Sequence, residues 1–151
     1  MLKRDSRAIL LVSAMLAPIS GLRAQEAQPL KAADLSIAGI SVDQDSATVR
    51  RHLGTPASID SAGWHYQDLQ VFLVAGKVGI LSITGPSRQT HRGLRVGDPL
   101  SRAVRLYRPC VADSTIVQIC FKTTDFDERA VIAVIVGGHV SRISVGRIIE
   151  P

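Results

Sequence analysis

The sequence predicts an α+β protein made of two repeated helix–β-hairpin units, which form an antiparallel sheet with short helices packed on one face. Two internal matches lead to this prediction. Residues 38–53 (AGISVDQDSATVRRHL) align with residues 92–107 (RGLRVGDPLSRAVRLY) at a constant offset of 54. Residues 71–83 (VFLVAGKVGILSI) align with residues 133–145 (AVIVGGHVSRISV) at an offset of 62. A glycine, a short helix and a hairpin that recur in this order indicate a duplicated unit.

The expected domain is single and covers residues 37–151, with the repeats over residues 37–86 and 91–147. The offset between the halves grows from 54 to 62, so the second repeat has extra residues between its helix and its last hairpin. Both cysteines and the polar segment TTDFDER fall in that stretch. A chain of 151 residues is the usual size of one domain or of two very small ones.

Each repeat contains a short segment with the start and stop signals of a helix. In the second repeat, Asp98 is a suitable N-cap and Pro99 a suitable first helical residue. The apolar residues that follow recur at helical spacing and form one stripe: Leu100, Ala103, Val104 and Tyr107. In the first repeat, Asp43 or Asp45 caps a helix that ends at Gly54.

Apolar segments on either side of glycine turns predict the strands. GWHYQ and LQVFLVAGKVGILSIT supply up to three strands, with a tight turn at Ala75-Gly76. STIVQICFK and AVIAVIVGGHVSRISVG supply three more, with a turn at Gly137-Gly138.

The first 24 residues have the layout of a secretory signal peptide. Lys3, Arg4 and Arg7 form a basic head, an apolar run follows, and small residues lead to an expected cleavage after Ala24. A membrane anchor is the alternative, but about ten apolar residues are too few for a bilayer that needs about twenty. We expect an exported protein, periplasmic or secreted, with no transmembrane segment after signal removal. Residues 25–36 are expected to form a flexible lead-in.

Removal of the expected signal changes the charge of the protein. Residues 1–24 hold four of the 18 Lys and Arg residues and one of the 13 acids, which leaves 14 basic and 12 acidic residues, a net charge of +2. A nucleic-acid-binding face needs clustered basic residues and aromatic rings for stacking, and aromatic residues are 4% of this chain. A nucleic-acid partner is therefore not expected.

Cys110 and Cys120 are the two cysteines of a chain that is expected to enter an oxidising compartment. A bridge between them would close a short loop and stabilise the fold by roughly 2 to 3 kcal/mol. We expect this disulfide; the alternative is a pair of buried free thiols. Strand alternation places Cys120 opposite Ile119 and Phe121, so the bridge lies outside the core if those two residues face inward.

Two segments, GISVDQDSATVRRHLGTP and TGPSRQTHRGLRVGDPLSRAVRLY, resemble the fold shared by the outer-membrane assembly lipoprotein family BamE (SmpA/OmlA) and the β-lactamase inhibitor protein. The likeness is a glycine, a short amphipathic helix, an LG-x-P exit and the following hairpins, over about residues 37 to 147. It implies a small envelope or secreted domain that binds other proteins and does no chemistry. This sequence lacks the cysteine that is acylated in the lipoprotein members, and no binding residue of the family matches a position here.

The candidate partner-binding residues are Trp64, Tyr66, Arg88, Arg92 and Arg95. The three arginines, together with His91, form a local positive cluster that suits an acidic protein, lipid headgroups or a polyanion. The alternative is a solvated linker. The two aromatic residues share one strand face, as the anchors of a protein interface would. The alternative is that they cover the edge of the core.

The stretch TGPSRQTHRGLRVGDPLSRAVRLY also has the glycines of a phosphate-binding loop. However, Gly97-Asp98-Pro99 at the helix start puts a carboxylate where the anion would bind, and the proline removes a backbone donor. The four histidines are scattered and have no partner at metal-ligand spacing, so no metal site is expected. No catalytic residues and no cofactor are expected either.

These observations together predict a non-enzymatic protein-binding or envelope-assembly module whose partner is another envelope or secreted protein. One alternative is a small-ligand binder or small enzyme that uses the concave sheet face. The polar candidates for that function are His65, Gln70, Ser82 and Gln118. A purely structural domain is the other alternative.

Overall fold

The computed structural model describes residues 29–112, 114, 117–123 and 129–147. The expected signal peptide and the first residues of the lead-in, 25–28, lie outside the described residues. The described elements follow one another along the chain in this order: η1 (Ala32–Leu35), β1 (Ser36–Ile37), β2 (Ile40–Ser41), α1 (Ser46–Leu53), β3 (Ser58–Asp60), β4 (Gly63–Tyr66), β5 (Leu69–Val74), β6 (Lys77–Ile83), α2 (Leu100–Tyr107), β7 (Cys110–Ala112), β8 (Val117–Thr123), β9 (Arg129–Val136) and β10 (His139–Arg147).

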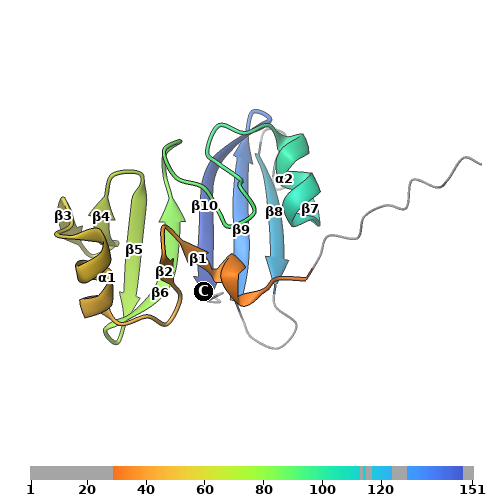
Figure 1. The fold of residues 1–151 in the computed structure, drawn as a ribbon. Coiled ribbons are helices and arrows are strands. Elements are labelled where there is room, and N and C mark those ends of the chain that lie inside the picture. Colours follow the sequence, from red (N-terminus) through yellow and green to blue (C-terminus); the bar gives the residue numbers. More distant parts are fainter. Residues whose placement is uncertain (1–28, 113, 115–116, 124–128, 148–151) are drawn as a thin grey trace, which may run out of the picture.

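Eight of these strands form one antiparallel sheet in the order β3-β4-β5-β6-β10-β9-β8-β7 (Figure 1). The remaining two, β1 and β2, pair only with each other. Pairing of β6 with β10 joins the strands of the first half to those of the second, so the sheet is continuous. The turns at Ala75-Gly76 and Gly137-Gly138 are confirmed, and all four residues have positive φ.

The predicted α+β fold of two repeated helix–β-hairpin units is wrong. The protein is mostly β: each α-helix has eight residues, and the strands hold more than twice as many of the described residues as the helices do. The matched glycines have a simpler cause than duplication. Gly39 and Gly93 have φ values of +79° and +84°, and Gly76 and Gly138 have +77° and +81°, so each is a turn position where glycine is the favoured residue. Apolar alternation around such turns is what any antiparallel sheet requires.

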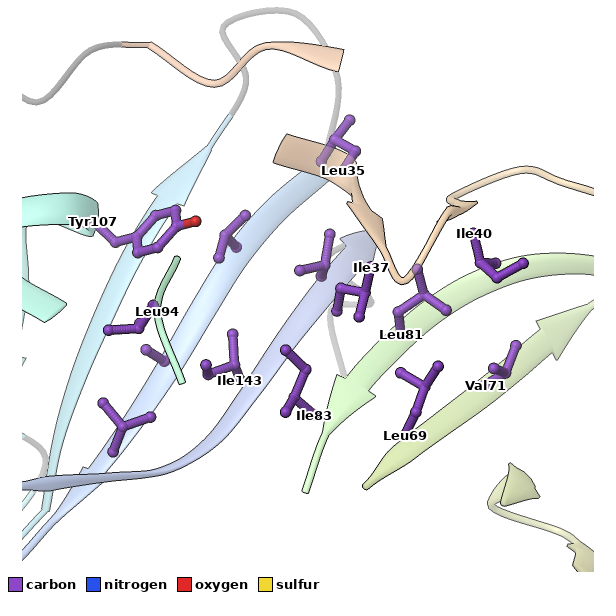
Figure 2. Packing of buried hydrophobic residues seen from close by; sticks show 14 of the residues in the cluster. Leu35, Ile37, Ile40, Leu69, Val71, Leu81, Ile83, Leu94, Tyr107 and Ile143 are labelled. Atoms are coloured by element: carbon purple, nitrogen blue, oxygen red, sulfur yellow. The ribbon is translucent and has the colours of Figure 1, made fainter. Parts of the chain in front are cut away.

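The core lies on one face of the sheet, where two rows of apolar residues cross the four central strands (Figure 2). The rows are in register: Leu69, Ile83, Ile143 and Ala133 form one, and Val71, Leu81, Val145 and Val131 form the next. Val49 of α1 and Tyr107 of α2 join this same core. Both helices therefore cover one sheet face, with η1 and the β1–β2 hairpin between them (Figure 1).

The helix starts agree with the sequence in one case and differ in the other. Asp45 caps α1, since its Oδ1 accepts a hydrogen bond of 2.8 Å from the Thr48 amide. In α2 the cap position is Pro99, which has no side-chain cap bond, so the predicted Asp98 cap is wrong. The Asp98 carboxylate instead accepts from the Arg95 amide at 2.9 Å and thereby closes the loop before the helix.

The segment expected to be a flexible lead-in differs from that expectation where the structure describes it. Residues 32–35 form η1, and Asp34 and Leu35 are buried. Leu35 belongs to the main core. The folded domain therefore begins before residue 37.

Candidate functional site

The sheet face opposite the core, which we call the outer face, is covered by no element in the described parts of the chain (Figure 1). Its residues alternate with core residues along the central strands. One polar row crosses five neighbouring strands in register: Ser58, His65, Gln70, Ser82 and Ser144. Three of the four polar candidates from the sequence lie in this row. The side chain of the fourth, Gln118, falls outside the described part of the structure.

Hydrogen bonds hold four side chains of the polar row, those of His65, Gln70, Ser82 and Ser144. Ser82 Oγ and Ser144 Oγ lie 3.0 Å apart, and Gln70 Nε2 donates to the Ala62 carbonyl oxygen at 2.6 Å. His65 Nε2 lies 2.9 Å from Asp60 Oδ1, and this hydrogen bond lowers the pKa of Asp60. The imidazole is thus engaged by a carboxylate, and each serine hydroxyl is engaged by the other. Such a row offers fixed hydrogen-bonding groups for recognition.

An apolar row runs beside the polar one. Phe72, Ile80, Gly146 and Ala130 follow one another in register across β5, β6, β10 and β9. The Phe72 and Ile80 side chains are half-buried, as is Ile132, the register partner of Ser144. Together with the two serines, Ile80 and Ile132 line a shallow hollow of about 300 Å³.

Glycine allows the close approach of strands beneath this hollow. A Cβ at Gly146 would overlap the carbonyl oxygen of Gly79 on the neighbouring strand. Gly79 lies where the register between β5 and β6 shifts by one residue, which is a β-bulge. A larger side chain at position 146 would therefore push β6 and β10 apart.

Two arginines, Arg142 and Arg147, lie next to the hollow. Arg142 lies on the outer face two residues before Ser144, is exposed, and makes no hydrogen bond or ion pair with the described residues. Arg147 borders the hollow, and its guanidinium donates to Asp43 Oδ1 at 2.9 Å. Arg129 also binds Asp43, so two arginines share a single carboxylate. Along β10, Arg142 and Arg147 therefore lie on opposite sides of the hollow.

The predicted aromatic candidates lie on the other side of the sheet. Trp64 and Tyr66 are half-buried and pack against the core cluster. The Arg50 guanidinium carbon lies 4.7 Å from the centroid of the Trp64 ring, and Tyr66 donates to the Gly54 carbonyl oxygen at 3.2 Å. Burial raises the pKa of Tyr66. The two rings thus cover the edge of the core beneath α1.

The predicted arginine cluster is dispersed by the fold. Arg95 is exposed, and its Nε and Nη2 donate to Gln89 Oε1 at 3.0 and 2.8 Å. Arg88 lines a separate pocket with His91. Arg92 turns inward to Asp34. The three arginines therefore do not form one positive surface.

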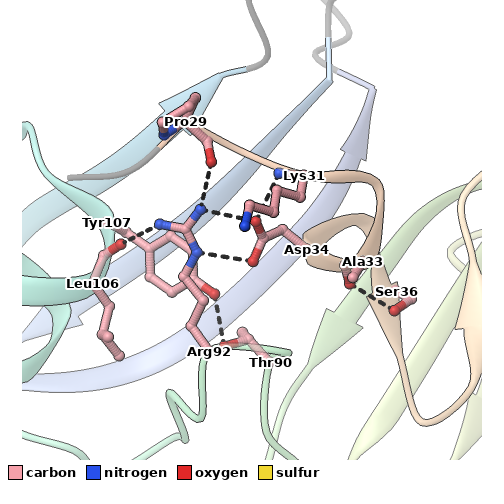
Figure 3. A network of polar contacts seen from close by, with 9 residues as sticks. All are labelled: Pro29, Lys31, Ala33, Asp34, Ser36, Thr90, Arg92, Leu106 and Tyr107. Carbon is pink, nitrogen blue, oxygen red and sulfur yellow. Dashed lines mark hydrogen bonds and ion pairs between the residues drawn. The ribbon is translucent and has the colours of Figure 1, made fainter.

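Arg92 holds the chain before β1 against the rest of the fold (Figure 3). Its Nε and Nη2 donate to the two carboxylate oxygens of Asp34, each at 2.8 Å, in the paired geometry that suits a guanidinium. Two further bonds reach the carbonyl oxygens of Leu106 and Pro29, at 3.1 and 2.9 Å. The Asp34 side chain is 2% exposed and that of Arg92 is 16% exposed. A buried ion pair thus joins η1, the loop before α2 and the end of α2.

Burial and hydrogen bonding around this pair shift the pKa values of Asp34, Arg92 and Tyr107. Burial on its own would raise the pKa of Asp34, but hydrogen bonds from Arg92 and from the Lys31 amide outweigh it, so the pKa of Asp34 is lowered. Tyr107 lies beneath the Arg92 guanidinium and donates to Thr90 Oγ1 at 2.8 Å. Burial raises the pKa of Tyr107 to about 12. Asp34 carries no signal in the sequence that would mark it as buried.

The two cysteines are neighbours in the sheet. Cys110 of β7 is the register partner of Cys120 of β8. Cys110 packs against the core cluster, so the expectation that the bridge lies outside the core does not hold for this residue. Cys110 is not a free thiol in the structure. Its pairing with Cys120 stays a prediction that mass measurement can test.

No group of three or more potential metal ligands comes together in the part of the chain that the structure describes. No helix within it is long and apolar enough to cross a membrane.

Comparisons with known proteins leave the family open. No family model matches the chain, and no curated protein matches it. Among solved structures, an extracellular protein containing an SCP domain from Bacillus anthracis aligns with a TM-score of 0.48 and 12% sequence identity. The alignment covers 80% of this chain and 48% of that one, so this chain spans about half of its length. At this TM-score and identity the likeness supports no conclusion about function, and the resemblance to the BamE family stays a prediction.

Proposed function

We propose that this protein is an exported, non-enzymatic binding module that holds an acidic, extended segment of another envelope or secreted protein on its outer face. The observation that carries the proposal is the composition of that face. Half-buried apolar side chains and a row of hydrogen-bonding groups lie side by side on a face without a covering element in the described residues. Apolar contacts surrounded by polar groups are typical of protein interfaces.

The positive charge of the outer face favours a partner segment that carries negative charge. Arg142 is exposed on the outer face and has no hydrogen-bond or ion-pair partner among the described residues. Opposite charges across an interface steer association and fix the register of the partner. A segment with apolar side chains for the hollow and a carboxylate for Arg142 fits both features. Export rests on the signal segment expected over residues 1–24.

A site-specific crosslinking experiment tests this function. A photoreactive phenylalanine derivative replaces Phe72 on the outer face in one variant and Val104 on α2 in the control. Val104 is 37% exposed and belongs to the helix that packs on the opposite face. Both variants are irradiated in the cells that make the protein. We expect one defined protein adduct from position 72 and none of the same mass from position 104.

A substitution at Arg142 is the second part of the crosslinking experiment. Arg142→Glu in the position-72 variant should reduce the adduct at least about tenfold, since a favourable charge contact becomes a repulsive one. An adduct that forms equally well from position 104, or one that Arg142→Glu does not change, would refute the outer face as the binding surface.

The hollow also favours a second candidate, a small-molecule binder. About 300 Å³ lined by Ile80, Ile132 and the two serines is enough for a small apolar ligand with one polar group. Native mass spectrometry of the protein purified from its source distinguishes the candidates. A bound small molecule that is lost when Ile132→Trp fills the hollow would favour this candidate over a protein partner.

A further inference from the structure

A second pocket lies on the core side of the protein, away from the outer face. It has a volume of about 410 Å³ and is bounded by the β1–β2 turn on one side and by residues 87–91 on the other. Its lining is polar apart from Ala38. One wall of this pocket therefore comes from the motif-like stretch TGPSRQTHRGLRVGDPLSRAVRLY. This stretch contributes nothing to the outer face.

The charged groups that line the pocket are all basic. Arg88 and His91 both line it, and none of the carboxylates in the described ranges does so. Neither side chain makes a hydrogen bond or close ion pair within the described residues. A guanidinium and an imidazole at one cavity supply the N–H donors that an oxyanion needs.

The nearest carboxylates are already engaged by other groups. Asp68 accepts hydrogen bonds from the amide and the hydroxyl of Ser87, and Arg88 acts on it only through longer-range electrostatics. Asp34 is bound by Arg92 and by the Lys31 amide, and His91 acts on it in the same longer-range way. Neither carboxylate occupies the pocket, so the pocket keeps its positive character.

The wall that carries the basic groups is held in place by buried polar contacts. Thr90 is 2% exposed, and its Oγ1 accepts from the Leu94 amide at 3.1 Å and from Tyr107 at 2.8 Å. Both of these bonds are accepted, so the Thr90 hydroxyl keeps a proton that it can donate, and Thr90 is one of the residues that line the pocket. Gly85 approaches the Asp68 carboxylate so closely that a Cβ would overlap it, which fixes the start of the segment.

We propose that this pocket binds a small oxyanion, such as a phosphate group, through Arg88, His91 and the hydroxyl of Thr90. The mode differs from that of a phosphate-binding loop, because side chains supply the charge and no helix start takes part. A free phosphate ion and the phosphate of a lipid headgroup share this chemistry. The inference does not depend on the function proposed for the outer face.

The test is a titration of the purified protein with sodium phosphate, followed by two-dimensional NMR of backbone amides. Sodium chloride at equal ionic strength serves as the reference, because salt alone screens surface charges. We expect saturable shifts at Gly39, Arg88 and His91, with a dissociation constant near or below about 10 mM, the range of a few charge-assisted hydrogen bonds. Amides around Arg142 should respond only to ionic strength.

Matched variants assign the effect to the pocket. Arg88→Gln should weaken phosphate binding at least about tenfold, which is the loss of one charge-assisted contact. Arg105→Gln is the control, since that arginine belongs to the same stretch, is exposed on α2 and does not line the pocket. Tenfold weakening in the Arg105 variant as well, or no saturable shift at Arg88 and His91 up to about 50 mM phosphate, would overturn the proposal.

A vesicle arm identifies the source of the anion. The protein is sedimented with vesicles of phosphatidylcholine that contain phosphatidic acid, with and without competing phosphate. Sedimentation that phosphate and Arg88→Gln both abolish would assign the site to a lipid headgroup. Saturable phosphate binding without sedimentation would assign it to a free anion. Sedimentation that neither phosphate nor Arg88→Gln reduces would contradict the pocket as the membrane contact.

Discussion

Arg92 shows how far a residue's role can differ from what its sequence context indicates. In the sequence it stands among other arginines and a histidine, which predicts an exposed basic cluster. In the structure its guanidinium is paired with Asp34, 58 residues away along the chain, and with two carbonyl oxygens. A side chain that finds four acceptors is stable inside the fold, whereas Arg95 finds a single acceptor, Gln89, and remains at the surface.

The buried pair predicts a specific dependence of stability on pH. The pKa of Asp34 is lower in the folded protein than the ordinary value of an aspartate, because Arg92 and the Lys31 amide donate hydrogen bonds to its carboxylate. A group with a lowered folded pKa stabilises the fold above its unfolded pKa, and this stability is lost as pH falls through the folded value. Urea denaturation should therefore show the free energy of unfolding falling below about pH 4. Asp34→Asn should be less stable at pH 7 and should change less between pH 4 and pH 2.

Removal of the Arg92 guanidinium is a second test of the Asp34–Arg92 pair. Arg92→Ala leaves a buried carboxylate without its partner, for which we expect a loss of about 3 kcal/mol at pH 7. Arg95→Ala is the control and should change stability by less than about 0.5 kcal/mol, as is usual for an exposed polar residue. Equal effects of the two substitutions would contradict the role of the Asp34–Arg92 pair.

At the scale of elements, the sequence predicts those whose signals are local. Strand alternation and turn glycines place β5, β6, β9 and β10 together with their tight turns. The edge strands β3 and β7 are missed because each has three residues and its place depends on pairing with one neighbour. The helix η1 is missed because it is held in place by a tertiary contact, the hydrogen bond that Arg92 donates to Asp34.

The edge strand β7 has three residues and, among the described strands, pairs with β8 alone. A covalent bond between the register partners Cys110 and Cys120 would secure this edge of the sheet. Loss of the bridge in Cys110→Ala should lower the free energy of unfolding by about 2 to 3 kcal/mol. Val111→Ala is the control, since that side chain is 49% exposed on the same strand, and it should have little effect.

Mass spectrometry measures the bridge directly. The oxidised protein should resist alkylation until a reductant is added, and should then take up two alkyl groups. Alkylation of both cysteines without reductant would show that the thiols are free. That result would also remove one of the arguments for an oxidising compartment.

At the scale of the whole molecule, the candidate site arises from strand order that local signals do not contain. His65, Gln70 and Ser82 are visible in the sequence as polar residues of the sheet. Their alignment with Ser144 depends on the pairing of β6 with β10, and Ser82 and Ser144 lie 62 residues apart along the chain. Alternation shows that each strand has two faces, but only the positions of the helices decide which face is open.

The continuous sheet and the shared core predict that both halves of the chain unfold together. Trp64, the one tryptophan, lies in β4 near one edge of the sheet, whereas Ile135 lies in β9, beyond β10 from the first half. Ile135 is buried in the same core cluster as Val71, the register partner of Trp64. A substitution that destabilises the core at Ile135 should therefore also shift the unfolding transition that Trp64 reports, because the halves unfold cooperatively.

Urea denaturation followed by two probes measures this coupling. Tryptophan fluorescence reports the surroundings of Trp64, and far-ultraviolet circular dichroism reports the whole sheet. In the unmodified protein the two transitions should coincide. Ile135→Val, which should cost about 1 kcal/mol, should move both midpoints by the same amount. If the fluorescence midpoint stayed in place while the dichroism transition broadened or split, the halves would be separate folding units and β6–β10 pairing would not join them into one.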